Sequence, residues 1–304
     1  MIFAIMKETE QVSLVGLGAV GMVLASRLHD RLGDRFTIVA DAARRERLRH
    51  EGVYFNGSRY DFAAADPADG PKDLILIATK ASGLSSALDA IAPYVGPETV
   101  ILSLLNGIDS EQRVAERFGP ERVLYSYFLG HPSLREGNRT IHDGVFRISF
   151  GEADNRQPSE RVEHIRRLFD RADIPCDTPP DMLSALWQKF VINIGCNQTT
   201  ALLRRPYGHL QRNERAMALA LALMDEAATV AERLGIAGTD TMVARAVEVI
   251  RSMNPDGKSS MLQDVEAGRP TEIDIFAGTL CRLAAEQGIA VPYNTTALRI
   301  LSAL

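Results

Sequence analysis

The sequence has few cysteines, and they are scattered. Only three occur in 304 residues, Cys176, Cys196 and Cys281, each in apolar surroundings. An odd number at such wide spacing argues against a disulfide framework and against a metal site, and it predicts free thiols in a reducing compartment. We therefore expect a metal-free, cytoplasmic protein.

Long apolar runs are also missing. No stretch approaches the roughly 18 apolar residues that a membrane-spanning helix needs, so we expect no insertion into a membrane. The apolar start at residues 1–6 is followed at once by charged residues. That start is too short for the core of a signal peptide, and no small-residue cleavage site follows it.

Positive charge is not in excess. The chain has 34 Lys and Arg against 39 Asp and Glu, a formal net charge of −5 at pH 7. A mildly acidic chain is not expected to bind nucleic acid through phosphate contacts. The shares of hydrophobic residues, 46%, and charged residues, 24%, are ordinary for a globular protein and exclude a mainly disordered one. At roughly 150 residues per domain, the length predicts about two domains.

Strand-like and helix-like runs alternate in the first half of the chain, from residue 11 to about 178. Apolar runs predict strands at 12–15, 36–39, 73–78, 99–104 and 123–128. Helical patterns lie at 20–32, 42–50, 85–92 and 110–118. This alternation indicates an α/β domain, in which a doubly wound parallel sheet has helices on both faces.

Two turn dipeptides interrupt this pattern and predict β-hairpins. Asn56-Gly57 separates 53–55 from 59–62, and Asp143-Gly144 separates 140–141 from 146–148. Both dipeptides tolerate the positive φ angles of tight hairpin turns.

The strands stop after Pro179-Pro180. Helical spacing follows at 181–203, 214–234, 239–251 and 273–287. The predicted layout is therefore an α/β domain at 1–178 and a C-terminal all-helical domain at 179–304.

A glycine-rich loop joins the first predicted strand to the first predicted helix. It reads Gly16-Leu17-Gly18-Ala19-Val20-Gly21. In such a GxGxxG run the first glycine allows the tight turn, the second lets a pyrophosphate approach the backbone, and the third lets helix and strand pack closely. The N-terminus of the helix adds unpaired N–H groups. The loop predicts dinucleotide binding in a Rossmann-type domain; the alternative is a tight structural turn.

The end of the second strand should select between NAD(H) and NADP(H), and it carries opposite charges. Asp41 lies 20 residues after Gly21, where an acidic side chain usually binds the ribose 2′-hydroxyl and favours NAD. Arg44 and Arg45 follow it closely and offer charge to a 2′-phosphate. Asp41 also fits as the cap of the helix that begins at Ala42. The residues alone leave both cofactors open.

Two further strand ends are polar where a doubly wound sheet binds its ligand. Lys80 follows the third strand, and Asn106, in the step Asn106-Gly107, follows the fourth. Because the carboxyl ends of such strands line the cofactor crevice, we expect both side chains to contact ligand. The alternatives are a solvated lysine and a simple Asn-Gly turn.

A polar stripe runs along the otherwise apolar predicted helix at 181–203. Lys189, Asn193 and Asn197 are spaced four residues apart, which places them on one face. Burying a lysine is costly unless it meets a partner or a ligand. Gly195 inside the helix indicates a close packing contact. An ammonium group beside a ketone that receives a hydride stabilises the charge on oxygen and donates the proton. The alternative is a surface helix with Lys189 in water.

A third polar segment lies late in the chain. Ser260 and Asp264 are four residues apart on a predicted helix, Thr271 precedes another as an N-cap would, and Glu272 falls in its first turn. These residues alone indicate little beyond capping.

Taken together, these motifs resemble those of the ketopantoate reductase (2-dehydropantoate 2-reductase) family. The resemblance runs from Gln11 to near the C-terminus. It implies a dinucleotide-binding Rossmann domain at 1–178 and a helical substrate and catalytic domain at 179–304. The implied reaction is the reduction of ketopantoate to pantoate with NADPH, a step toward pantothenate and coenzyme A. It also implies a small-molecule 2-oxo acid substrate and a homodimer.

The resemblance further implies a role for each motif residue. Lys189 matches the general acid, and the substrate-binding positions match Asn193, Asn197 and Ser260. The glycine loop, Lys80, Asn106 and Glu272 match residues on the cofactor side of the family's active site.

Two positions depart from the family pattern. Asp41, with Arg44 close by, stands where NADPH-using members commonly have arginine, so NAD(H) remains an alternative to NADP(H). Tyr207 stands where some members have an asparagine that reaches the substrate. Reduction of another branched 2-oxo acid, or a non-catalytic dinucleotide-binding regulator, are the alternative functions.

Overall fold

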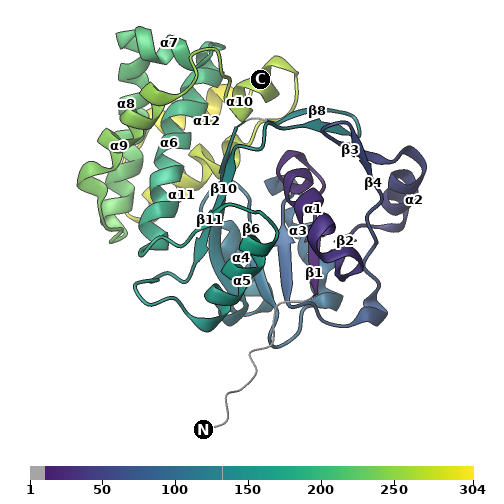
Figure 1. Cartoon of the computed structure of the whole chain (residues 1–304). Helices are drawn as coiled ribbons and strands as arrows, with labels where there is room; N and C mark the ends of the chain where they lie inside the picture. Colours follow the sequence, from purple (N-terminus) through teal and green to yellow (C-terminus); the bar gives the residue numbers. More distant parts are fainter. Residues whose placement is uncertain (1–10, 132) are drawn as a thin grey trace. The chain divides into compact units, whose positions relative to one another are not determined.

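The computed structural model describes residues 11–131 and 133–304 (Figure 1). The start of the chain, where the sequence predicts no signal peptide, lies outside these residues. The chain divides into two compact units. The first comprises the residues up to Leu105 together with Ser110–Met182, and the second comprises Asn106–Asp109 and Leu183–Leu304.

A seven-stranded sheet forms the centre of the first unit. Its strands are β1 (Val12–Val15), β2 (Phe36–Val39), β5 (Leu74–Ile77), β6 (Val100–Ser103), β7 (Val123–Gly130), β10 (Phe146–Gly151) and β11 (Cys176–Asp177). Their order in space is β11-β10-β7-β6-β5-β1-β2. Neighbouring strands from β2 to β7 are parallel, and β10 runs antiparallel to β7. The predicted α/β fold class is confirmed.

Helices cover both faces of this sheet. They are α1 (Ala19–Leu32), α2 (Ala42–Glu51), α3 (Leu84–Ile91), α4 (Ser110–Phe118) and α5 (Glu160–Arg171). Short 3-10 turns are η1 (Gly33–Arg35), η2 (Pro67–Asp69), η3 (Ala81–Gly83), η4 (Ala92–Tyr94) and η5 (Pro120–Arg122). In β5, Leu74 and Leu76 pack into the core under α1 and α5, whereas Ile75 and Ile77 pack into the core under α3 and α4. This two-sided burial explains why the strand is apolar throughout.

A second, four-stranded sheet lies beside α1 and α2 (Figure 1). Its strands are β3 (Val53–Phe55), β4 (Ser58–Tyr60), β8 (Leu134–Glu136) and β9 (Arg139–Ile141), in the order β4-β3-β9-β8. The hairpin predicted at Asn56-Gly57 is confirmed, because β3 and β4 pair antiparallel across it.

The hairpin predicted at Asp143-Gly144 is wrong. This turn connects β9 to β10, but β9 pairs with β3 and β8, whereas β10 pairs with β7 and β11. Burial explains the difference. Phe146, Ile148 and Phe150 of β10 are all buried in the central core, whereas Ile141 of β9 is 57% exposed. These three side chains alternate along β10 and so lie on one face of it, where the central core covers them.

The second unit is helical in its described residues. It contains α6 (Met182–Leu203), α7 (Tyr207–Arg212), α8 (Glu214–Arg233), α9 (Thr239–Ser252), α10 (Ser260–Glu266), η6 (Ile273–Ile275), α11 (Ala277–Glu286) and α12 (Pro292–Leu301). The helix predicted at 273–287 is therefore interrupted. Its break is at Phe276, whose φ and ψ of −100° and −91° are not helical.

The close contact predicted at Gly195 is present between α6 and α8. A Cβ atom on Gly195 would lie 2.4 Å from Cγ of Met224 and 3.1 Å from the carbonyl oxygen of Ala220. Only glycine therefore lets the two helices approach as closely as they do.

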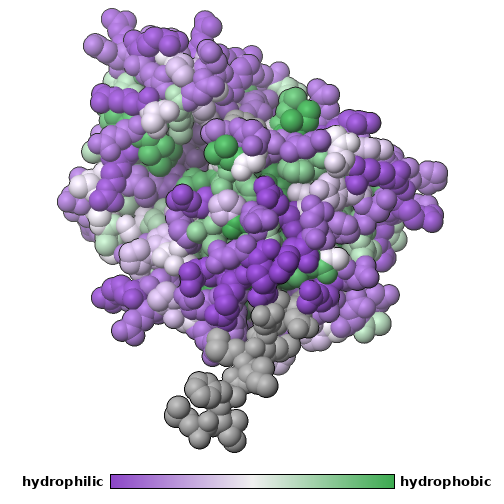
Figure 2. All heavy atoms as spheres, viewed as in Figure 1, coloured by the Kyte–Doolittle hydropathy of each residue, from purple (hydrophilic) through white to green (hydrophobic). Residues whose placement is uncertain are grey.

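The cysteines are free thiols, as predicted. Burial raises the pKa of Cys196 to about 12. In the part of the chain that the structure describes, no helix meets the length and apolarity required of a membrane span, and no cluster of His, Cys, Asp and Glu side chains is arranged to hold a metal ion. Figure 2 shows hydrophilic residues over most of the viewed face, with smaller hydrophobic groups between them.

Candidate active site

The glycine loop follows β1 and lies against the end of β5. Gly16 has a φ of +99°, and a Cβ atom there would lie 2.6 Å from the carbonyl oxygen of Ala78. A Cβ atom on Gly21 would lie 1.8 Å from the carbonyl oxygen of Gly16. Glycine is therefore required at both positions, as the motif predicts.

The beginning of α1 leaves backbone donors for a ligand. Gly18 is the N-cap and supplies no side-chain cap, and the amide of Met22 is the first to bond back to the Gly18 carbonyl, at 3.0 Å. The N–H groups of the first turn of a helix have no acceptors within the helix itself. With the positive end of the helix dipole, they fit the pyrophosphate of a dinucleotide. The predicted residues Gly16 to Gly21 thus form a cradle suited to such a cofactor.

Asp41 caps α2, as one of the alternatives from the sequence requires. Its Oδ1 atom accepts a hydrogen bond of 2.7 Å from the backbone amide of Arg44. Arg44 itself is half-buried in the first turn of α2. Lys80 is exposed after β5, and its carbonyl accepts from the amide of Gly83 at 2.9 Å.

Three predicted site residues meet in the second unit. Nζ of Lys189 donates to Oδ1 of Asn106 at 3.1 Å, and Nδ2 of Asn106 donates to Oε2 of Glu272 at 3.2 Å. All three side chains are half-buried. An amide has one acceptor side and one donor side, so this orientation of Asn106 satisfies both the ammonium and the carboxylate.

Backbone geometry brings these three residues together. Lys189 lies in α6, Asn106 opens the segment Asn106–Asp109, and Glu272 immediately precedes η6. Gly107 has a φ of +95°, and a Cβ atom there would lie 3.4 Å from Cβ of Ile275 in η6. The Asn-Gly step is thus a tight turn packed against η6, which carries Asn106 to Lys189.

The polar stripe continues along α6. Asn193 and Asn197 follow Lys189 at successive turns, and Nδ2 of Asn197 donates to Oδ1 of Asn193 at 3.4 Å. Asn193 is half-buried and Asn197 is buried. The stripe therefore has one cationic end and a neutral remainder with both donors and acceptors.

Ser260 is separate from this network. It is exposed at the first position of α10, and within the described residues no hydrogen bond joins it to the polar stripe. The buried neighbour Ser259, which sequence reasoning missed, caps α10 and bonds to Thr200 Oγ1 of α6 at 2.7 Å. Ser259 therefore links the start of α10 to α6. The one feature of the sequence that could have indicated this role is a serine at the expected start of a helix.

The capping predicted for Thr271 is wrong. Glu272, not Thr271, holds the N-cap position of η6, and no side-chain cap bond forms there. The carboxylate of Glu272 binds Asn106 instead. Asp264 forms an ion pair with Nε of Arg269 at 2.8 Å, a partner that spacing alone did not indicate.

Two further residues bear on the site. Tyr207 opens α7 with its ring against Gly257, and burial raises the pKa of its phenol, as does the nearby Cys196. Arg135 of β8 donates through Nη1 to the carbonyl of Leu17 in the glycine loop. Sequence reasoning missed Arg135, because 118 positions separate the two residues.

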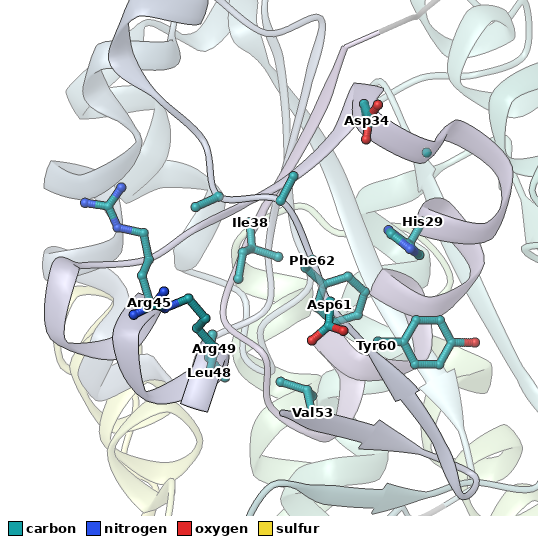
Figure 3. Close-up of a pocket in the computed structure, with 13 residues that line it drawn as sticks. His29, Asp34, Ile38, Arg45, Leu48, Arg49, Val53, Tyr60, Asp61 and Phe62 are labelled. Atoms are coloured by element: carbon teal, nitrogen blue, oxygen red, sulfur yellow. The ribbon is translucent and has the colours of Figure 1, made fainter. Parts of the chain in front are cut away.

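A pocket of about 390 Å³ lies elsewhere in the first unit, between α1, α2 and β4 (Figure 3). The His29 ring packs edge-on against Phe62 at 5.4 Å, and Arg45 and Arg49 lie across the pocket on α2. Of the residues that the sequence analysis considered for ligand binding, its lining contains Arg45 alone, and its charges, which include Asp34 and Asp61, are mixed. The candidate functional residues are therefore those of the glycine loop in the first unit and of the Lys189 network in the second.

Comparison with known proteins identifies the family. The family model "Ketopantoate reductase PanE/ApbA" matches residues 12–155, and "Ketopantoate reductase PanE/ApbA C terminal" matches residues 181–304. The 2-dehydropantoate 2-reductase of Vibrio cholerae is 30% identical over 224 residues, which are 73% of this chain and 74% of that protein.

Solved structures share the fold. The 2-dehydropantoate 2-reductase of Geobacter metallireducens superimposes with a TM-score of 0.82 at 28% identity, covering 96% of this chain and 99% of that one. A D-mandelate dehydrogenase in complex with NADH has a TM-score of 0.85 at 20% identity, covering 96% and 98%, and shows a common fold alone. The sequence matches to both family models and to the Vibrio enzyme show that this chain belongs to the ketopantoate reductase family.

Proposed function

We propose that this oxidoreductase reduces 2-dehydropantoate (ketopantoate) to pantoate with a nicotinamide cofactor, in the biosynthesis of pantothenate and coenzyme A. The observation that carries the proposal is the network of Lys189, Asn106 and Glu272, in a chain that belongs to the ketopantoate reductase family. An ammonium group held by a neutral amide suits the protonation of a ketone oxygen.

In this proposal Lys189 is the general acid. The cofactor, when bound, supplies the hydride to the ketone carbon. Nζ of Lys189 stabilises the negative charge that develops on the ketone oxygen and transfers its proton to that oxygen, which yields the hydroxyl group and a neutral amine. Asn106 holds Nζ in place at 3.1 Å and is itself oriented by Glu272.

The remaining predicted residues bind and orient. Asn193, Asn197 and Ser260 are assigned to the polar groups of the substrate, the carboxylate and the hydroxyl. The backbone of Gly16 to Gly21 is assigned to the pyrophosphate, and Lys80, Asn106 and Glu272 to the cofactor side of the site. Apart from Glu272, these assignments give dinucleotide binding to 1–178 and substrate binding and catalysis to the helical domain at 179–304.

The same proposal includes the setting of the enzyme. We expect a cytoplasmic homodimer that acts on a small 2-oxo acid. The dimeric ketopantoate reductase of Staphylococcus aureus, whose structure has the same fold, supports the expected dimer. Neither nucleic acid nor a membrane is an expected partner.

A second candidate function is the reduction of a different branched or aromatic 2-oxo acid. Tyr207, in place of the asparagine found in some members, favours it, because a half-buried phenol differs in shape and polarity from an asparagine side chain. The fold shared with a D-mandelate dehydrogenase is consistent with such a change of substrate.

A substrate panel tests the proposal. Initial rates of NADPH and NADH oxidation are measured with ketopantoate, unbranched and branched 2-oxo acids, and benzoylformate. The proposal predicts the highest kcat/KM for ketopantoate. A clear preference for another acid would support the second candidate, and cofactor binding without turnover of any acid would indicate a non-catalytic regulator.

A further inference from the structure

The turn η6 packs against the segment that carries Asn106. Glu272 directly precedes η6, and Ile275 is its last residue. A Cβ atom on Gly107 would lie 3.4 Å from Cβ of Ile275 and 3.4 Å from its carbonyl oxygen. Gly107 adjoins Asn106, whose Nδ2 atom donates to Glu272 at 3.2 Å. The two ends of η6 therefore contact the Asn-Gly turn, one by a hydrogen bond and the other by packing.

The residue after η6 packs against the helix that carries Lys189. Phe276 is fully buried, and its ring centroid lies 6.2 Å from that of Phe190, at an interplanar angle of 30°. Phe190 adjoins Lys189 in α6 and meets the ring of Trp187 edge-on at 5.4 Å. The three aromatic rings therefore anchor the start of α11 on α6, next to the proposed acid.

The backbone of Phe276 connects this aromatic contact to η6. Its amide donates to the carbonyl of Ile273 at 3.2 Å, and its carbonyl accepts from the amide of Leu280 at 3.0 Å in the first turn of α11. The amide of Ile275 donates in turn to the carbonyl of Glu272 at 3.2 Å. Because these bonds hold η6 as one short unit, a displacement of the Phe276 ring also displaces Glu272.

The hydrogen bonds of the network need such support. The side chains of Lys189, Asn106 and Glu272 are half-buried, so water competes for their polar groups. The two bonds, of 3.1 and 3.2 Å, are at the long end of the usual range. Functional groups keep a productive geometry when packed side chains lock the residues that orient them. In this unit the packed side chain beside the network is Phe276.

We propose that Phe276 is a positioning residue, which sets the place of Glu272 by packing on Phe190. Glu272 then orients the amide of Asn106 toward Lys189. The inference rests on the proposed role of Lys189 as the general acid. It assigns to an apolar side chain that touches no polar group of the network a role in the rate of the reaction.

A double-variant cycle tests this inference. The value of kcat for ketopantoate reduction is measured for the unaltered chain, Phe276→Leu, Glu272→Ala and the double variant. A small misplacement of a catalytic group is costly, so Phe276→Leu should lower kcat roughly tenfold or more. If the ring acts through Glu272, adding Phe276→Leu to Glu272→Ala should change kcat by less than about twofold.

Labelling of lysine with acetic anhydride gives a measurement that needs no substrate. The rate at pH 8 is followed by mass spectrometry for Lys189 relative to Lys258, which pairs with Glu266. An ammonium group that no longer has a carboxylate held near it loses its proton more readily. The relative rate for Lys189 should therefore rise roughly threefold in Phe276→Leu and in Glu272→Ala, and no further in the double variant.

The chain offers a matched control for the loss of a buried ring. Phe169, in the core of the first unit, is also fully buried and meets Phe150 edge-on at 5.4 Å. Phe169→Leu should lower the thermal unfolding midpoint, as Phe276→Leu does, but should leave kcat and the lysine labelling unchanged. Phe190→Leu removes the other ring of the proposed contact, and it provides a second variant if Phe276→Leu does not fold.

Two outcomes would overturn the inference. Unchanged kcat and labelling in a folded but less stable Phe276→Leu would show that Phe276 is a core residue only. The same fold loss of kcat with and without Glu272→Ala would show that the ring does not act through Glu272. If the unaltered chain turned over no 2-oxo acid while the labelling cycle still coupled the two residues, the positioning of Glu272 would stand and the proposed function alone would fail.

Discussion

Nζ of Lys189 lies 3.1 Å from Oδ1 of Asn106, although 83 positions separate the two residues in the chain. The contact depends on the Asn-Gly turn after β6, which carries Asn106 into the same compact unit as α6. Asn106 is bound in turn by Glu272. The orientation of the proposed acid is therefore set by residues from two other parts of the chain.

Replacing Asn106 by aspartate should move the pH dependence of the reaction. Asn106→Asp places a second carboxylate beside Glu272 and the Lys189 ammonium, and while this carboxylate is ionised it favours the charged lysine, so the pKa of the lysine rises. Because the acid must be protonated, the fall of kcat/KM on the alkaline side should shift to higher pH. Asn106→Ala should instead lower kcat without this shift. The pH profiles and kcat values of both variants provide the measurement, and full kcat in Asn106→Ala would contradict a positioning role for Asn106.

Replacing Gly195 by alanine should destabilise the helical unit. The new methyl group would lie 2.4 Å from Cγ of Met224 and 3.1 Å from the carbonyl of Ala220. Overpacking of this kind costs about 1–3 kcal/mol. Denaturant unfolding of Gly195→Ala should show that loss.

The variant Met224→Ala supplies the control for the Gly195 contact. The double variant should be more stable than the sum of the two single changes predicts, since removing the Met224 side chain makes room for the methyl group. Strict additivity would mean that the two helices are not in the close contact described.

The ion pair of Glu152 and Arg161 should make stability depend on acid pH. Hydrogen bonds from Arg161, and then from Ser159, lower the pKa of Glu152 relative to its ordinary value. The folded state thus holds the ionised carboxylate more favourably than the unfolded state does. This contribution is fully present above the ordinary glutamate pKa of about 4.3, and is lost as pH falls through the lowered value of the folded state.

Glu152→Gln should therefore lower the melting temperature at pH 7 and make it less dependent on pH below about 5. Glu98→Gln, at an exposed turn, is the matched control. If both variants melted with the same pH dependence as the unaltered chain, Glu152 would not be the source of acid sensitivity.

The sequence predicted the central sheet well because burial on both faces leaves a clear local pattern. Each strand of that sheet from β1 to β7 coincides with an apolar run of the sequence. In β5, Leu74 and Leu76 pack into one core and Ile75 and Ile77 into the other, so every position of the strand is apolar. Helix α6 and its polar stripe could also be predicted, because the spacing of Lys189, Asn193 and Asn197 is visible within one segment of the sequence.

Pairing between distant segments could not be predicted in this way. A turn dipeptide specifies a bend but not the partner of each strand, so β9 and β10 were wrongly joined. The contact of Arg135 with Leu17 has no local signature. The bond from Asn106 to Glu272 spans 166 positions, and a capping position was the only role that the sequence around Glu272 indicated.

The most direct test of the account is the initial rate of NADPH-dependent ketopantoate reduction by Lys189→Ala. Lys258→Ala is the control, because Lys258 pairs with Glu266 at 2.8 Å on α10 and has no assigned role in the reaction. A positioned general acid contributes roughly 10²–10⁴-fold, so Lys189→Ala should lose activity on that scale while still binding NADP⁺, and Lys258→Ala should retain it. Full turnover by Lys189→Ala would contradict the assignment of Lys189 as the acid.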